Sequence, residues 1–196
     1  MKLLLATRNR NKVKEIREMF DIPELELLTA DEVAGLPGEV EEDADTFEGN
    51  ALKKASVLCG ASGIWTMADD SGLEVDALGG APGVYSARYA GEECNTPANN
   101  AKLLAALSGV DQRSARFRCA IALCAPDGRR WTVSGSCEGR IADAPSGDAG
   151  FGYDPLFVPE GYEQTFAELG PEVKNKISHR AVALKKAAGL LSEVLG

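Results

Sequence analysis

Long apolar segments are absent from this sequence of 196 residues, in which no hydrophobic run reaches the length of about 18 that crosses a bilayer. The apolar start at Leu3, Leu4 and Leu5 breaks after Ala6, too early for a signal peptide. The five cysteines are odd in number and lack metal-type spacing, as is typical of reduced thiols. We therefore expect a cytoplasmic protein with no membrane partner.

Positive charge is also scarce, with 21 basic against 30 acidic residues and a net charge of −9. A duplex-binding protein normally presents a basic face, so we expect no nucleic-acid polymer as partner. No GxxxxGK[ST] loop occurs, which excludes a P-loop nucleotidase, and Gly147, Gly150 and Gly152 lack the strand–helix context of a dinucleotide fingerprint. An anionic small substrate would need local lysines and a metal to draw it in.

A length of 196 residues suits one domain, or one domain with two lobes, over residues 1–196. Periodicity and turn residues predict strands at 2–6, 25–29, 64–68, 116–125, 129–136 and 156–158. They predict helices at 12–20, at 46–60, at 96–107 and after the cap residue Ser178. The turn at 126–128 joins two strands as a hairpin, so the expected fold is α/β with a mixed sheet.

The stretch from Met67 to Gly91 is the most informative part of the chain. An apolar run ends on Asp69 and Asp70, and two adjacent carboxylates at the end of a buried strand are costly unless a metal or a lysine lies beside them. A glycine-rich turn and Arg88 follow, which favours the edge of an active site. The alternative is a solvated turn whose acids cap something local.

Two further segments carry cations suited to an anion. Lys12 lies in the first turn of a helix, where it opposes the helix dipole and is better explained by a bound phosphate than as an exposed surface lysine. Asn50 and Lys54 lie one turn apart and therefore project from one helix face. The acidic run at 39–45 ahead of them is usually just a solvated loop.

A third group combines aromatic, acidic and cationic residues. Tyr153 and Asp154 follow a glycine-rich loop, and His179, the one histidine, precedes Arg180. A lone histidine is more often packed or capping, and Tyr153 suits a core or interface position equally well. Taken together, the three groups indicate metal-dependent chemistry on a nucleotide phosphate.

Six segments in order, at 7–12, 46–54, 68–73, 80–89, 151–155 and 178–180, resemble the inosine/xanthosine triphosphate pyrophosphatase family. The resemblance covers essentially the whole chain. It implies an α/β fold with a long central mixed sheet and two lobes flanking a substrate cleft, assembled as a homodimer. It also implies Mg²⁺-dependent hydrolysis of ITP, dITP and XTP to monophosphate and pyrophosphate, which removes these nucleotides from the pool.

The resemblance also implies residue roles. Asp70 would be the general base and, with Glu41, would hold Mg²⁺, while Asp69 and Asn50 would support them. Phe151 would stack on the base, whose edge Asp154, Lys174, His179 and Arg180 would contact. The implied phosphate and substrate contacts are Thr7, Arg8, Asn9, Arg10, Asn11, Lys12, Lys54, Ser71, Gly152 and Tyr153.

Two residues depart from the family pattern, Cys137 and Arg8, and Arg8 could add a phosphate contact. Two other functions stay open. One is a related pyrophosphatase for pyrimidine nucleotides, which would release pyrophosphate from dTTP or UTP at least as fast as from dITP. The other is a nucleotide-sensing protein that binds ITP and leaves it intact.

Overall fold

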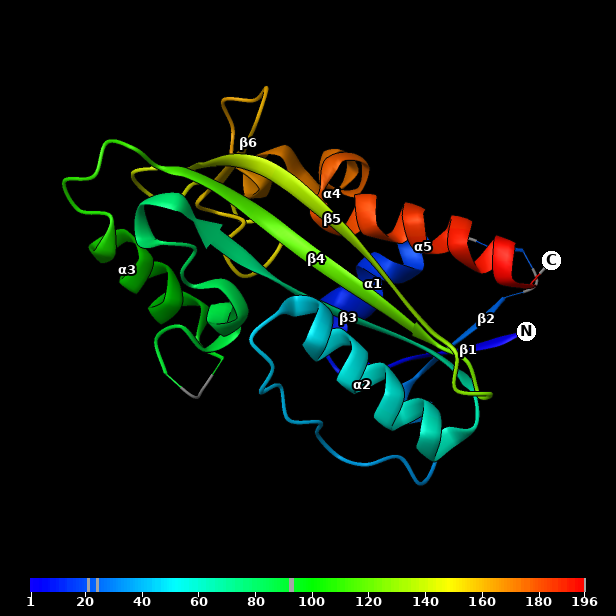
Figure 1. Cartoon of the computed structure of the whole chain (residues 1–196). Coiled ribbons are helices and arrows are strands. Elements are labelled where there is room, and N and C mark those ends of the chain that lie inside the picture. The colour runs from blue at the N-terminus through cyan, green and yellow to red at the C-terminus, as the bar shows by residue number, and fades with distance from the viewer. Residues whose placement is uncertain (21, 24, 92–93, 196) are drawn as a thin grey trace. The chain divides into compact units, whose positions relative to one another are not determined.

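The computed structural model describes residues 1–20, 22–23, 25–91 and 94–195 and has the alternation of strands and helices expected of an α/β fold (Figure 1). The strands are β1 (Lys2–Leu5), β2 (Glu26–Thr29), β3 (Trp65–Val75), β4 (Ser114–Cys124), β5 (Arg130–Ile141) and β6 (Phe157–Pro159). The α-helices are α1 (Arg10–Met19), α2 (Phe47–Ser62), α3 (Thr96–Ala106), α4 (Phe166–Ile177) and α5 (His179–Leu195). Short 3₁₀ helices lie at η1 (Ala30–Glu32), η2 (Asp76–Leu78) and η3 (Gly83–Arg88).

The strands form a six-stranded sheet in the order β2-β1-β3-β4-β5-β6. Strand β1 pairs in parallel with β2 and with β3, whereas β5 pairs antiparallel with β6. Strands β4 and β5 run side by side and are joined by a tight turn in which the Gly128 amide donates to the carbonyl of Ala125 (Figure 1). Such a short connection requires an antiparallel pair. The expected α/β class with a mixed sheet is therefore confirmed.

Strand β3 is the main departure from the expected elements. The sequence predicts a strand that ends at Ala68, but β3 continues through Asp69 and Asp70 to Val75. Both acids are buried inside the strand rather than placed at its end. The acids are tolerated there because lysines of α1 and α2 contact them, as described below.

Several helix boundaries also differ from expectation. Helix α2 passes through Gly60 and ends at Ser62, because Gly63 adopts the left-handed conformation that stops the helix. Helix α3 begins at Thr96, capped by the side chain of Asn95, and ends at Ala106, one residue earlier than expected. Helix α4 was not expected at all, although Thr165 and Glu168 form a capping box at its start.

The chain divides into two compact units, and β3, β4, β5 and α5 contribute residues to both. Unit 1 comprises residues 1–70, 119–135 and 181–196. Its core holds apolar residues of β1, α1, β3, β4 and α5, among them Leu3, Ile16 and Leu184. Trp65 and Trp131 stack beside this core with ring centroids 5.7 Å apart and planes 11° from parallel.

Unit 2 comprises residues 71–118 and 136–180. Phe117, Phe157 and Phe166 form the aromatic centre of its core, and Phe117 also stacks on the His179 ring at 4.7 Å. Within the described part of the chain, no helix combines the length and the apolar character needed to cross a membrane. The five cysteines are free thiols. The expectation of two lobes that flank a cleft stays a prediction.

Candidate functional site

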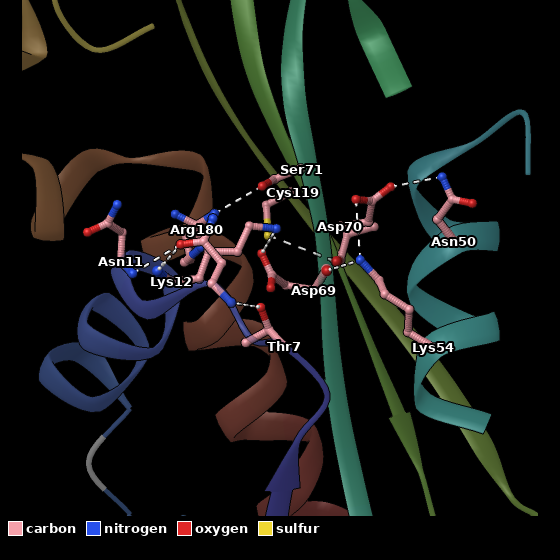
Figure 2. A network of polar contacts seen from close by, with 12 residues as sticks. Thr7, Asn11, Lys12, Asn50, Lys54, Asp69, Asp70, Ser71, Cys119 and Arg180 are labelled. Atoms are coloured by element: carbon pink, nitrogen blue, oxygen red, sulfur yellow. Dashed lines mark hydrogen bonds and ion pairs between the residues drawn. The ribbon is translucent and has the colours of Figure 1, made fainter. Parts of the chain in front are cut away.

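The buried acids of β3 meet lysines from two helices of unit 1. Lys12 of α1 lies 3.0 Å from Asp69 Oδ2, and the Asp69 side chain is only 1% exposed. Lys54 of α2 lies 3.5 Å from Asp70 Oδ1, and Asn50, one turn earlier, donates to Asp70 Oδ2 at 3.1 Å. Figure 2 shows Asn50 and Lys54 reaching from α2 to Asp70. We call Lys12, Lys54, Asp69 and Asp70 the acid–lysine cluster.

Lys54 is the most heavily engaged cation of this cluster. Its Nζ donates at 2.8 Å to Glu42 Oε1 and at 2.7 Å to the backbone carbonyl of Asp69, in addition to its contact with Asp70. The segment before α2 is anchored at two further points: Lys53 pairs with Asp43 at 2.6 Å, and the Ala44 amide donates to Asn50 Oδ1 at 2.9 Å. The acidic run is thus attached to α2 rather than only solvated.

Burial and charge act in opposite directions on this cluster. Burial raises the pKa of Asp70 above its ordinary value, although Lys54 and Lys12 partly offset the effect. Burial also lowers the pKa of Lys54, but the charges of Asp70, Asp69 and Glu42 outweigh it, so the net pKa is raised. Lys54 therefore stays protonated, while Asp70 accepts a proton more readily than an exposed aspartate does.

The turn before α1 is held by its own side chains. Asn9 caps the helix by accepting from the amides of Asn11 and Lys12, and Thr7 Oγ1 accepts from the Asn9 amide at 3.2 Å. The cap thus engages the amides of Asn11 and Lys12 at the start of the helix. Arg8 contacts the Pro37 carbonyl at 3.2 Å and Asp31 at 3.6 Å, whereas Arg10 is exposed.

Glu42 is a member of the site to which the family resemblance implied no role. It contacts Lys54, whereas its neighbour Glu41, the expected metal ligand, is exposed. Both acids lie in an irregular segment without periodicity, so no sequence signal indicates which of them faces α2. The assignment of Glu41 to a metal stays a prediction.

A second cluster lies in unit 2 around the Phe151 ring. Lys174 Nζ lies 4.5 Å from the ring centroid of Phe151 and 2.6 Å from Asp154 Oδ2. The guanidinium of Arg180 lies 5.9 Å from the same centroid and donates to Ser71 Oγ at 2.9 Å (Figure 2). Asp154 Oδ2 also accepts from the Phe151 amide at 2.8 Å. We call Phe151, Asp154, Lys174 and Arg180 the aromatic–cation cluster.

Three other expected site residues lie beside this cluster. His179 is buried and stacks on Phe117 of the core. The Tyr153 hydroxyl is buried and donates to the Ser86 carbonyl at 2.7 Å, and burial raises the pKa of Tyr153. The carbonyl of Gly152 accepts from Asn100 Nδ2 of α3 at 3.2 Å. Tyr153 and Asn100 therefore fix the backbone that carries Phe151.

These two clusters supply complementary chemistry. Lys54 is buried and Lys12 is half-buried, and both lie beside paired carboxylates. Such an arrangement suits phosphates and a divalent cation. A half-buried aromatic ring flanked by Lys174, Arg180 and Asp154 suits a flat polar heterocycle. An α/β fold with both clusters defines a nucleotide-processing protein.

Comparison with known proteins places the chain within this class. Residues 3–190 match the Ham1 family, and the chain belongs to that family. It is 55% identical to the dITP/XTP pyrophosphatase of Desulforamulus reducens over 99% of this chain and 97% of that protein. It is 52% identical to the dITP/XTP pyrophosphatase of Geobacter sulfurreducens over 100% of this chain and 96% of that protein. The resemblance expected from the six motifs is confirmed.

The fold comparison agrees. The Ham1 protein of Staphylococcus aureus superposes with a TM-score of 0.89 at 38% identity, covering 98% of this chain and 99% of that one.

Proposed function

We infer that this protein is a dITP/XTP pyrophosphatase, a hydrolase that cleaves non-canonical purine nucleoside triphosphates to the monophosphate and pyrophosphate. Its substrates include dITP, XTP and ITP, and their removal keeps them out of the nucleotide pool. The observation that carries this inference is the acid–lysine cluster around Asp70, in a chain more than half identical to proteins of that name. The expected function agrees with this family evidence.

We propose that Lys12 and Lys54 hold the triphosphate. Each lysine is paired with a carboxylate, Lys12 with Asp69 and Lys54 with Asp70. A bound phosphate would replace one anionic partner by another, so neither lysine has to be buried without a counter-charge. Thr7 and Asn9 order the turn from which Lys12 projects. The negative charge of the whole chain makes these local lysines necessary for attracting the substrate.

Asp70 is the proposed general base. Its raised pKa makes it a better proton acceptor than an exposed aspartate, provided that it is ionised when the substrate arrives. Asn50 holds one carboxylate oxygen from α2, which fixes the direction of the other. Asp70 would take the proton of the attacking water, while Lys54 beside it offsets negative charge that develops on the phosphates.

The donor set fits Mg²⁺. The carboxylates of Glu42 and Asp70 both contact Lys54 Nζ, at 2.8 and 3.5 Å, so two carboxylates lie close enough together to hold one further cation. Among the described residues no group of three or more acids, histidines or cysteines converges. Mg²⁺ needs no such group, because it takes one or two carboxylates together with substrate phosphates and water. When bound, Mg²⁺ neutralises phosphate charge and orients the attacking water.

The aromatic–cation cluster is proposed to receive the base. Phe151 would stack on the purine, and donors such as Arg180 suit the 6-keto acceptor of hypoxanthine and xanthine. Adenine presents a 6-amino donor to the same groups, which leaves donors facing donors and disfavours it. The homodimer and the cytoplasmic location remain predictions; sedimentation and cell fractionation test them.

A nucleotide panel tests the function. Purified protein with Mg²⁺ is given dITP, XTP, dATP, dGTP and dTTP, and pyrophosphate and orthophosphate are scored separately. Pyrophosphate from dITP and XTP, lost on chelation, is the expected result. Faster release from dTTP would favour the pyrimidine enzyme, and binding of ITP without turnover would favour a sensor.

A further inference from the structure

The loop that leads into the aromatic–cation cluster is fixed to the first turn of α4. Ser146 Oγ donates to Glu168 Oε1 at 2.7 Å, and Thr165 Oγ1 donates to the Ser146 carbonyl at 2.7 Å. The Ala149 amide then donates to the Ala167 carbonyl at 3.3 Å. The backbone directly before Gly150 therefore has little freedom to retreat.

Gly150 lies against the carboxylate of Asp154. Its φ is +78°, and a Cβ placed on it would collide with Asp154 Oδ2, while Asp154 Cγ would lie 2.9 Å away and Asp154 Cβ 3.1 Å away. The same Oδ2 accepts from the Phe151 amide at 2.8 Å and from Lys174 Nζ at 2.6 Å. One oxygen atom thus joins the backbone of Phe151 to the cation above the Phe151 ring.

A side chain at position 150 would displace this carboxylate rather than the loop. The backbone upstream is held at the Ser146 carbonyl and at the Ala149 amide. The Asp154 side chain has two torsions of its own, so we expect the collision to be relieved by a shift of its carboxylate. Rotation would remove Oδ2 from both of its donors. Both lost hydrogen bonds involve a charged group and are therefore among the stronger ones. Their loss would release the Phe151 backbone and the Lys174 side chain from their positions.

We propose that Gly150 is a positioning residue for base recognition: its lack of a side chain lets Asp154 hold Lys174 and the Phe151 backbone in place. The proposal rests on the proposed function, in which this cluster receives the base. Gly150 touches no substrate in this account and acts through Asp154. It would therefore affect which base is accepted more than how fast the phosphate is cleaved.

Gly161 provides a matched control in the same unit. Its φ is +83°, close to that of Gly150, but a Cβ there meets no atom within 4 Å. Gly161→Ala and Gly150→Ala thus share the backbone strain of a left-handed alanine, and only Gly150→Ala adds the collision with Asp154. A difference between the two variants isolates the collision.

The first experiment measures kinetics of both variants with dITP and dATP. For Gly150→Ala we expect KM for dITP to rise roughly 10- to 100-fold while kcat stays within about threefold. The reason is that contacts to the base stabilise the bound substrate and the transition state equally, so their loss weakens binding and leaves the chemical step unchanged. The dITP/dATP preference should fall with it. Gly161→Ala should keep wild-type KM and preference. Equal kinetics for the two variants would overturn the proposal.

Amide hydrogen exchange supplies a readout independent of activity. The Phe151 amide should exchange faster in Gly150→Ala and at the wild-type rate in Gly161→Ala, because only the former displaces the acceptor. Unchanged protection of Phe151 in Gly150→Ala would overturn the proposal.

A double variant separates this proposal from the proposed function. In an Asp154→Ala background the colliding carboxylate is gone, so Gly150→Ala should change the dITP/dATP preference no further. An additional drop would overturn the positioning role. If Asp154→Ala itself keeps the wild-type preference, base recognition by this cluster fails instead, and the proposal fails with it. Should Gly150→Ala not fold, the double variant must still melt within a few degrees of Asp154→Ala, or the collision is not the cause.

Discussion

Replacement of Asp70 by asparagine removes a charge and keeps the shape of the side chain. The Asn50 amide is oriented by the Ala44 amide, which donates to Asn50 Oδ1, so Asn50 can offer only its NH₂ group to position 70. The new amide at position 70 would therefore direct its carbonyl toward Asn50 and its NH₂ group toward Lys54. In the wild-type protein Lys54 Nζ lies 3.5 Å from Asp70 Oδ1. The hydrogen bond to Asn50 survives this exchange.

The structure predicts a moderate loss of stability. Lys54 loses one anionic neighbour but keeps Glu42 and the Asp69 carbonyl. Burial raises the pKa of Asp70, so its charged form is disfavoured in the fold, and removing the charge offsets part of the lost attraction to Lys54. Because the new NH₂ group faces the Lys54 ammonium, donor against donor, we expect the free energy of unfolding to fall by about 1–3 kcal/mol. Each kcal/mol corresponds to about 2–4 °C in the melting temperature.

The effect on catalysis should be large. A positioned general base contributes about 10²- to 10⁴-fold, so Asp70→Asn should lower kcat for dITP by that factor. Pyrophosphate release, calorimetric binding of dITP and a thermal melt are measured on the same preparation. Asp76→Asn, which alters a surface partner of Arg116, serves as the control and should keep full activity. Near-normal turnover of Asp70→Asn would refute the assignment of the base, and loss of fold would refute the stability argument.

Three other perturbations test the two clusters. Lys12→Met removes the ion pair to buried Asp69 and should lower the free energy of unfolding by about 3 kcal/mol, measured by urea denaturation. Lys12→Arg keeps a positive charge at this position and should retain most of the wild-type stability. Equal urea midpoints for Lys12→Met and the wild-type protein would contradict this prediction. The kcat/KM for dITP should rise with pH, because the raised pKa of Asp70 keeps it protonated at low pH and only the ionised form accepts a proton; an acidic optimum argues against this base. Arg180→Ala should narrow the preference for dITP over dATP, and an unchanged ratio would move base recognition elsewhere.

Much of the fold could be predicted because its signals are local. The alternation of Phe117, Cys119, Ile121 and Leu123 predicts β4, since every second residue packs into a core. Helix α4 was missed because Gly170 and Pro171 interrupt its pattern, and Gly170 indeed has a non-helical φ of 77°. The extension of β3 was missed because its acids lie next to lysines of other elements, which periodicity cannot reveal.

The functional site, like the fold, could be predicted only in part from the sequence. Lys12 lies in the first turn of α1, but Lys54 lies in the middle of α2 and Asp70 inside β3. The sequence could group these residues because each belongs to a segment that resembles the same family. The choice between Glu41 and Glu42 depends on the path of an irregular segment, which is set by its attachment to α2. Gly150 is indistinguishable from other loop glycines in sequence, because its importance lies in a contact with Asp154 and not in its neighbours.

The stacked indoles of Trp65 and Trp131 have a practical consequence. They are the two tryptophans of the chain, and both belong to unit 1, while all four tyrosines, at 85, 89, 153 and 162, belong to unit 2. Each unit therefore carries its own kind of aromatic chromophore. Fluorescence excited selectively at tryptophan follows the melting of one half, tyrosine absorbance follows the other, and coincidence of the two curves would reveal whether they unfold as a single cooperative body.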